Sequence, residues 1–285
     1  MGLGFPFCSA RSWCLPPPLG EPRPSTFTGP LPHHPRMVMK DNLTMRFRER
    51  FYRTYVSSHL GACRSFTRSQ VDHDARLFSA LYGRYLPTSK DAKILEVGCG
   101  AGNFISFLRG RGYREVQGID LGEEQVTLAR HLGIDDVEVA NLFEYLPAHV
   151  EEFDMIVALD VIEHFTKDEI LLFLDLAYQA LRPRGRILLR TPNADSPFVS
   201  WILYGDFTHE IAFTPSSIKQ VLKVAGFGNI QVYALEPWIH GPASAVRWII
   251  WKMIKQIVRL YFLVEQGTAG SGVFTSNLLA VAEKI

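Results

Sequence analysis

The sequence predicts an α/β fold in which helices cover both faces of a mostly parallel sheet. A short apolar strand at 93–97 runs directly into a turn with a glycine at every second position. Strand-like and helix-like segments then alternate along the chain, as they do where crossover helices join parallel strands. Polar residues follow five of these strands, so we expect them at the sheet edge where such folds bind ligands.

Hydrophobic periodicity places the individual elements. Two helices precede the first strand, because aromatic residues and leucines recur at helical spacing in 44–60 and 72–85. Strands are expected at 93–97, 115–120, 136–140, 153–159, 185–191, 228–235 and 278–282. Helices are expected at 102–110, 123–131, 168–181 and 215–225.

The composition is that of an ordinary soluble α/β protein with one domain. The 285 residues are 47% hydrophobic and 21% charged, with a formal net charge of +1. A dedicated nucleic-acid binder usually carries a strongly basic face, so we expect no nucleic-acid partner. The four cysteines have no metal-site spacing, which favours a reducing cytoplasm. Residues 1–36 are rich in proline and lack the pattern of a signal peptide, so we expect a disordered extension.

The glycine turn indicates a nucleotide-like cofactor. Gly98, Gly100 and Gly102 lack Cβ atoms where the backbone must bend and a ligand must approach bare amides. A dinucleotide fold would place its third glycine at position 103, but Asn103 stands there, which leaves an NAD-dependent enzyme as a third choice. Asp120 ends the next strand about twenty residues further on, where a carboxylate can bind both ribose hydroxyls.

With Glu96, this turn resembles the first motif of the class I S-adenosylmethionine-dependent methyltransferases, acid-x-Gly-x-Gly-x-Gly. The resemblance covers roughly residues 70–235 and includes Asp160-Val-Ile-Glu-His164 after the fourth strand. It implies a Rossmann-like fold with a seven-stranded sheet, an antiparallel last strand and S-adenosylmethionine as cofactor. It also implies lid helices within 37–90 and a cofactor-binding domain over 91–285.

The resemblance implies a set of cofactor contacts at the carboxyl ends of the strands. Asp120 would hold the ribose, and Asp160 would border the sulfonium. For Asn141, contact with the adenine edge and mere loop filling are nearly equal alternatives. The expected contacts are Glu96, Gly98, Cys99, Gly100, Gly102, Asp120, Leu121, Asn141, Leu142, Asp160 and Val161. Methyl transfer is an in-line displacement that requires alignment but no metal, so no metal site is expected.

His209 is the best candidate for a general base, because an oxygen acceptor must lose a proton and histidine titrates near neutral pH. The segment Asp206-Phe-Thr-His-Glu210 resembles the corresponding loop of ubiquinone-biosynthesis O-methyltransferases and of sugar-modifying relatives. The alternative is that His209 only orients this loop. His164 is the second catalytic candidate, and Asn193, Asp206 and Thr208 are the expected substrate contacts.

The segment 243–264 combines basic residues on one helical stripe with an otherwise apolar sequence. Four charges make a membrane-spanning helix unfavourable. A helix in the membrane interface and a helix packed on the domain or a second subunit stay open as alternatives.

These features together predict a methyltransferase that acts on a hydroxyl of a small or lipid-linked acceptor, such as a sugar or a quinone-like ring. We expect it in the cytoplasm, either free or on the inner face of the membrane. The alternative is a non-catalytic, membrane-associated protein that binds S-adenosylmethionine or serves as a scaffold.

Overall fold

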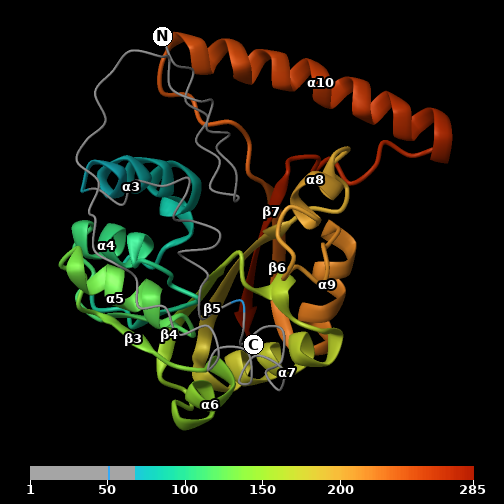
Figure 1. Ribbon diagram of the computed structural model, residues 1–285. Helices are drawn as coiled ribbons and strands as arrows, with labels where there is room; N and C mark the ends of the chain where they lie inside the picture. The colour runs from blue at the N-terminus through green and yellow to red at the C-terminus, as the bar shows by residue number, and fades with distance from the viewer. Residues whose placement is uncertain (1–50, 52–67) are drawn as a thin grey trace, which may run out of the picture. The chain divides into compact units, whose positions relative to one another are not determined.

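The computed structural model describes residue 51 and residues 68–285. These described residues form a seven-stranded sheet in the order β3-β2-β1-β4-β5-β7-β6 (Figure 1). The first five strands are parallel, whereas β7 pairs antiparallel with both β5 and β6. The strands are β1 Ile94–Val97, β2 Val116–Asp120, β3 Val137–Val139, β4 Phe153–Leu159, β5 Leu181–Pro192, β6 Phe227–Ala234 and β7 Asn277–Lys284. The predicted α/β class with an antiparallel last strand is confirmed.

Helices connect and cover the strands. They are α3 Arg68–Tyr82, α4 Asn103–Gly110, α5 Glu123–His131, α6 Leu142–Tyr145, α7 Lys167–Ala180, α8 Val199–Leu203, α9 Pro215–Val224 and α10 Pro242–Gln266, with 3-10 turns η2 Gly83–Tyr85, η3 Leu146–Ala148 and η4 Ile162–His164. The four helices expected after the first strand are present within one residue of their predicted ends. The proline-rich extension and, apart from residue 51, the helix expected at 44–60 lie outside the described residues. The domain boundaries expected at 36 and 90 stay predictions.

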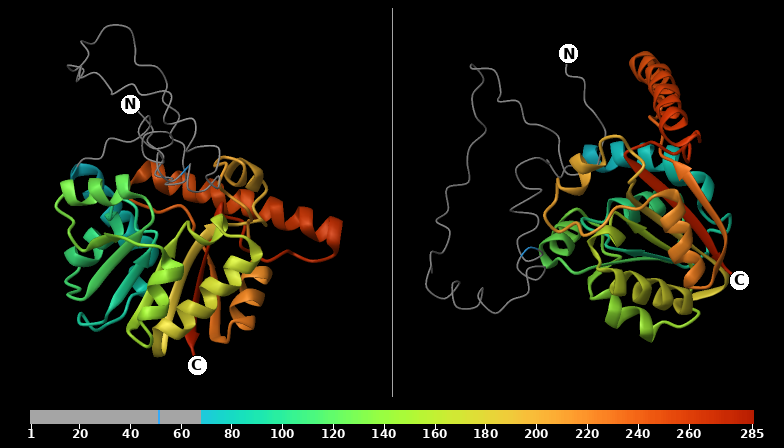
Figure 2. Two further views of the ribbon diagram at one scale, coloured as in Figure 1. Left: turned by 60° about the horizontal axis from the view of Figure 1, so that its bottom comes forward. Right: turned by 90° about the vertical axis from the view of Figure 1, so that its right-hand side faces the viewer.

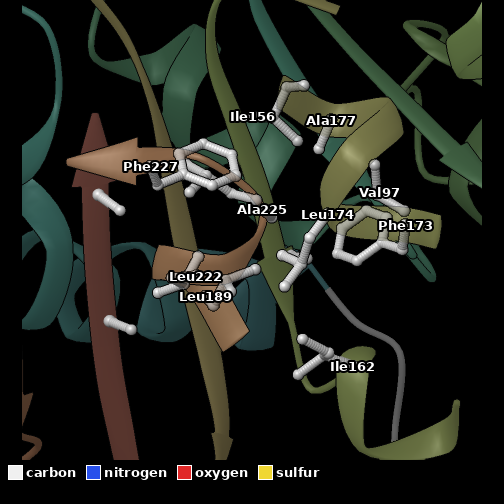
Figure 3. Close-up of a cluster of buried hydrophobic side chains, with 14 of the residues drawn as sticks. Val97, Ile156, Ile162, Phe173, Leu174, Ala177, Leu189, Leu222, Ala225 and Phe227 are labelled. Carbon is white, nitrogen blue, oxygen red and sulfur yellow. The ribbon is translucent and has the colours of Figure 1, made fainter. Parts of the chain in front are cut away.

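The sheet separates two hydrophobic cores, because successive side chains of a strand point to opposite faces. On one face, Leu95 and Val97 pack with residues of α7 and α9, the cluster drawn in Figure 3. On the other face, Ile94 packs with residues of α3, α4 and α5. Strands buried on both sides explain the near-continuous apolar runs in the sequence. Because the strands are buried on both faces, their carboxyl ends are held in place at one edge of the sheet.

Local sequence signals fix the ends of the covering helices. Thr166 and Glu169 form a capping box at the start of α7, and Thr214 and Ser217 form another at the start of α9. Strand β5 begins at Leu181, four residues before its predicted start. The register of the pairing between β4 and β5 shifts after Phe153. The residues of β5 at this shift form a bulge, although they belong to the strand.

Helix α10 includes the whole segment expected to be an amphipathic helix. It follows β6 and precedes β7 in the chain, and it extends beyond the layered body in both views of Figure 2. Within residues 68–285, no helix has the length and hydropathy needed to cross a membrane.

Candidate active site

The glycine turn after β1 has the left-handed backbone geometry that its sequence predicts. Gly98, Gly100 and Gly102 have φ angles of 69°, 55° and 74°, in the left-handed region that favours glycine. A Cβ on Gly98 would lie 2.4 Å from Cγ2 of Val161, in the loop after β4. The turn and this loop, which lie about sixty residues apart in the sequence, therefore meet at the carboxyl edge of the sheet.

Asp120 joins the turn to the loop after β2. Its carboxylate accepts hydrogen bonds from the backbone N–H of Gly100 at 2.9 Å and of Gly122 at 2.7 Å. Burial raises the pKa of Asp120, while the two backbone hydrogen bonds oppose this shift. The next residue, Leu121, exposes 49% of its surface although it is apolar. This pair thus offers anchored acceptor atoms next to an open apolar surface, as a ribose and its base require.

The surroundings of Glu96 indicate whether a polar ligand would fit beside the glycine turn. It lies in the middle of the buried strand β1 and is 3% exposed, and within the described part of the chain its Oε2 atom has no hydrogen-bond partner. Burial raises the pKa of Glu96 well above its usual range, the charge of Asp120 acts in the same direction, and Arg190 opposes them. A buried carboxyl oxygen without a partner is costly unless something binds it. The amine of the expected cofactor has the chemistry to do so.

Asp160 forms a partly buried ion pair that its sequence motif did not predict. Its φ angle is 58°, and both of its carboxylate oxygens accept from the guanidinium of Arg190 on β5. Nη1 of Arg190 also donates to the hydroxyl of Tyr82 on α3, at 2.8 Å. The sequence signal for this ion pair was an arginine inside the otherwise apolar run of β5. The expected contact of Asp160 with the cofactor stays a prediction, and the structure adds its pairing with Arg190.

Asn141 caps the short helix α6. Its side-chain oxygen accepts from the backbone N–H of Phe143 at 3.1 Å, and Leu142 begins the helix. The structural alternative for Asn141 therefore has direct support as a helix cap. A contact of Asn141 and Leu142 with an adenine stays a prediction.

The loop after β5 folds back onto the loop after β4. The backbone N–H of Glu210 donates to the carbonyl oxygen of Glu163 at 2.8 Å, and Phe213 pairs with Asn193 in an isolated parallel bridge. The rings of His164 and His209 consequently lie 4.7 Å apart, centroid to centroid. The two catalytic candidates, predicted from separate motifs, thus lie side by side.

Asp206 and Thr208 orient His164. Oδ1 of Asp206 accepts from the hydroxyl of Thr208 at 2.7 Å, and Oγ1 of Thr208 lies 2.9 Å from Nδ1 of His164. Because the one hydroxyl hydrogen points to Asp206, Nδ1 of His164 must be the protonated donor to Thr208. Both Asp206 and Thr208 are buried, at 6% and 1% exposure. Their expected contact with substrate stays a prediction, whereas their support of His164 was not predicted.

His209 has the tautomer that a base needs. Its Nδ1 lies 3.1 Å from the carbonyl oxygen of Ile202, which can only accept, so Nδ1 carries a hydrogen, and in the neutral ring the lone pair is on Nε2. His209 is half-buried, whereas His164 is buried and has a pKa lowered to about 4 by burial, with the charge of His209 acting in the same direction. His164 is thus neutral near physiological pH, and His209 is the more accessible of the two candidate bases.

Glu163, His164 and His209 form what we call the histidine–glutamate cluster. One ligand atom from each lies within 4.8 Å of the others, close enough to bind a metal ion. Oε2 of Glu163 is buried and has no hydrogen-bond partner among the described residues. Burial raises the pKa of Glu163 well above its usual range, and the charge of Asp160 raises it further. The cluster can therefore hold either a proton or a cation.

Asn193 supports the fold at the end of β5. Its amide nitrogen donates to the carbonyl oxygens of Val273 at 2.9 Å and Thr275 at 2.8 Å, and its oxygen accepts from the N–H of Asp195 at 3.1 Å. Its expected contact with substrate stays a prediction, and both amide hydrogens are already in use.

Comparison with known proteins agrees with this geometry. A family profile described as "Methyltransferase domain" matches residues 69–232. The mitochondrial ubiquinone biosynthesis O-methyltransferase of Rattus norvegicus is 36% identical over 128 residues, covering 42% of this chain and 36% of that protein. The ubiquinone biosynthesis O-methyltransferase of Idiomarina loihiensis is 25% identical over 162 residues, covering 50% of this chain and 64% of that protein. The chain thus spans between about a third and two thirds of the length of these relatives.

Solved structures share the fold. A SAM dependent methyltransferase from Archaeoglobus fulgidus has a TM-score of 0.57 at 21% identity, covering 74% of this chain and 94% of that one. Phosphoethanolamine N-methyltransferase 2 of Haemonchus contortus, solved with S-adenosyl-L-methionine, has a TM-score of 0.53 at 16% identity, covering 82% of this chain and 60% of that one. At these identities the likeness concerns the fold. With the family match over more than half of its length, the chain belongs to the methyltransferase domain family, that of the class I S-adenosylmethionine-dependent methyltransferases.

Proposed function

We propose that this protein transfers the methyl group of S-adenosylmethionine to a hydroxyl of a small or lipid-linked acceptor, with His209 as the general base. The observation that carries this proposal is the pair of histidines 4.7 Å apart at the carboxyl edge of the sheet, with Nδ1 of His209 held by the carbonyl oxygen of Ile202 so that Nε2 is the nitrogen left to act as a base. The ubiquinone O-methyltransferase relatives support a hydroxyl acceptor.

Different residues of the chain would bind the two ends of the cofactor. The glycine turn and Glu96 would hold the amino-acid end of the cofactor, and Asp120 with Leu121 would hold the nucleoside. The cofactor supplies a methyl group on a sulfonium that is already a good leaving group. The protein must therefore align the acceptor and remove its proton, which requires a base within hydrogen-bond reach.

Exposed aromatic residues near His209 favour an apolar or lipid-linked acceptor. Phe198, Trp201, Tyr204 and Phe207 expose between 58% and 80% of their surface, and they lie on α8 or next to it in the loop that leads to His209. Exposed apolar groups of this kind often mark a site of interaction with a ligand, a protein or a membrane. A quinone-like ring or a lipid-linked sugar would suit it, and a peripheral position on the cytoplasmic side of a membrane would follow.

The test measures release of S-adenosylhomocysteine from purified protein with a panel of catechol, quinol and lipid-linked sugar acceptors. We expect turnover with one of these classes, loss of turnover in His209→Ala, and unchanged binding of S-adenosylhomocysteine in that variant. The exposed His131→Ala is the matched control. Normal turnover in His209→Ala would exclude it as the base, and cofactor binding without turnover on every acceptor would favour the non-catalytic alternative.

A further inference from the structure

Helix α10 exposes a broad apolar face, whereas its opposite side, which includes Trp251, Lys255 and Phe262, is half-buried. Ten large apolar residues of this 25-residue helix are exposed, whereas Ser244 is its one buried residue within the described chain. The exposed residues are Val246, Ile249, Ile250, Met253, Ile254, Ile257, Leu260, Tyr261, Leu263 and Val264. At about 100° per residue they cover about half of the helix circumference, along a length of about 27 Å.

Ion pairs and a ring stack fix the rotation of the helix about its axis. Nζ of Lys252 lies 2.6 Å and Nζ of Lys255 lies 3.4 Å from the carboxylate of Glu236, in the segment after β6. Burial alone would raise the pKa of Glu236, but the hydrogen bond and charge of Lys252 and the charge of Lys255 outweigh it and leave the pKa lowered. Near the other end, Phe262 stacks on Phe274 at 5.5 Å between centroids. These contacts therefore hold the apolar face of α10 outward.

We propose that this outward face of α10 docks the protein on an anionic lipid bilayer, with the helix lying in the plane of the interface. The helix carries four basic residues and one acid, Glu265. At helical spacing, Arg247 lies on one flank of the apolar face and Arg259 lies on the other, next to Lys252, which also pairs with Glu236. Apolar residues bordered on both sides by basic ones match a surface with a hydrocarbon interior and negatively charged headgroups.

The width of the face favours a bilayer over a second copy of the chain. A two-helix seam uses a narrow stripe at two positions per heptad, whereas this face covers about half of the helix. A bilayer accepts such a face without a complementary shape. In Figures 1 and 2, α10 and α8 lie at the end of the domain to which the parallel strands point. Docking through α10 would thus bring the side that carries the catalytic candidates to the lipid.

The test is flotation of the full-length protein with vesicles of neutral phosphatidylcholine, or of phosphatidylcholine with about one third phosphatidylglycerol. We expect binding to the anionic vesicles, weakened by added salt. The double variant Ile250→Ser and Ile257→Ser should reduce the bound fraction roughly tenfold or more, because both side chains leave the hydrocarbon. The matched control replaces two exposed polar residues of the same helix, Gln256→Ser and Gln266→Ser, and should bind as the unmodified protein does.

Three results of the flotation experiment would overturn this proposal. They are absence of binding to anionic vesicles, equal binding to both vesicle types, and unchanged binding of the isoleucine variant. A fourth would be a stable dimer in lipid-free sedimentation velocity that the isoleucine variant dissociates, since the apolar face would then be a subunit interface. Circular dichroism of each variant confirms folding. Flotation requires neither cofactor nor acceptor, so its outcome is independent of the proposed methyl transfer.

Discussion

Acidification should destabilise the protein through His164, and the variant that tests this is His164→Gln. Burial disfavours the charged imidazolium, which lowers the pKa of His164 from 6.5 to about 4 in the folded state. A group with a lowered folded-state pKa stabilises the fold above its unfolded pKa. That contribution is lost as the pH falls from about 6.5 toward about 4.

The size of the effect follows from the same two values. Each pH unit over which the unfolded histidine is protonated and the folded one is not costs about 1.4 kcal/mol. Near pH 4.5 the loss from His164 therefore amounts to about 2.5 kcal/mol. This is a large part of the roughly 5–15 kcal/mol that stabilises a typical domain.

Urea denaturation of the unmodified protein and of His164→Gln, at a series of pH values from about 7.5 to about 4.5, measures this difference. We expect the free energy of unfolding of the unmodified protein to fall relative to that of the variant by about 2–3 kcal/mol. His131→Gln, at an exposed position, should keep the pH profile of the unmodified protein. Parallel profiles for His164→Gln and the unmodified protein would refute the burial of a neutral His164.

Three further predictions concern the same edge of the sheet. Tyr82→Phe leaves Nη1 of buried Arg190 without its 2.8 Å acceptor and should cost about 1–3 kcal/mol in urea denaturation, so an unchanged midpoint would contradict the pairing. Gly98→Ala places a Cβ 2.4 Å from Val161 at a φ of 69°, so we expect lower thermal stability and weaker binding of S-adenosylhomocysteine, and normal binding would show that the turn tolerates a side chain. Turnover should persist in a chelator, because in-line transfer needs no metal; loss of turnover that a divalent ion restores would instead assign the histidine–glutamate cluster a metal.

Local patterns predicted most of the fold. The strand ends, the glycine turn and the helices after it depend on periodicity and on backbone angles that only certain residues adopt, so they are visible in a short window of sequence. The bulged start of β5 was missed, because the residues around Pro183 and Gly185 have turn chemistry while Leu181 still pairs with Phe153.

The internal organisation of the site could not be predicted in the same way. His164 and His209 were both named from motifs, but they lie more than forty residues apart in the sequence. Their proximity depends on how the loop after β5 folds back onto the loop after β4. Asp206 and Thr208 were expected as substrate contacts, whereas the structure shows Asp206 bonded to Thr208, which in turn contacts His164. Such relays arise from tertiary packing, and no spacing in the sequence encodes them.

The most direct test of the central claim is calorimetric titration of the purified protein with S-adenosylhomocysteine, with NAD as control. We predict a dissociation constant on the order of micromolar for S-adenosylhomocysteine and no binding of NAD. Asp120→Ala should abolish the binding, because the two oxygens proposed to bind the ribose and the hydrogen bond to Gly100 are lost together. Absence of binding to the unmodified protein, or binding of NAD in its place, would contradict the assignment of the glycine turn and Asp120 to S-adenosylmethionine.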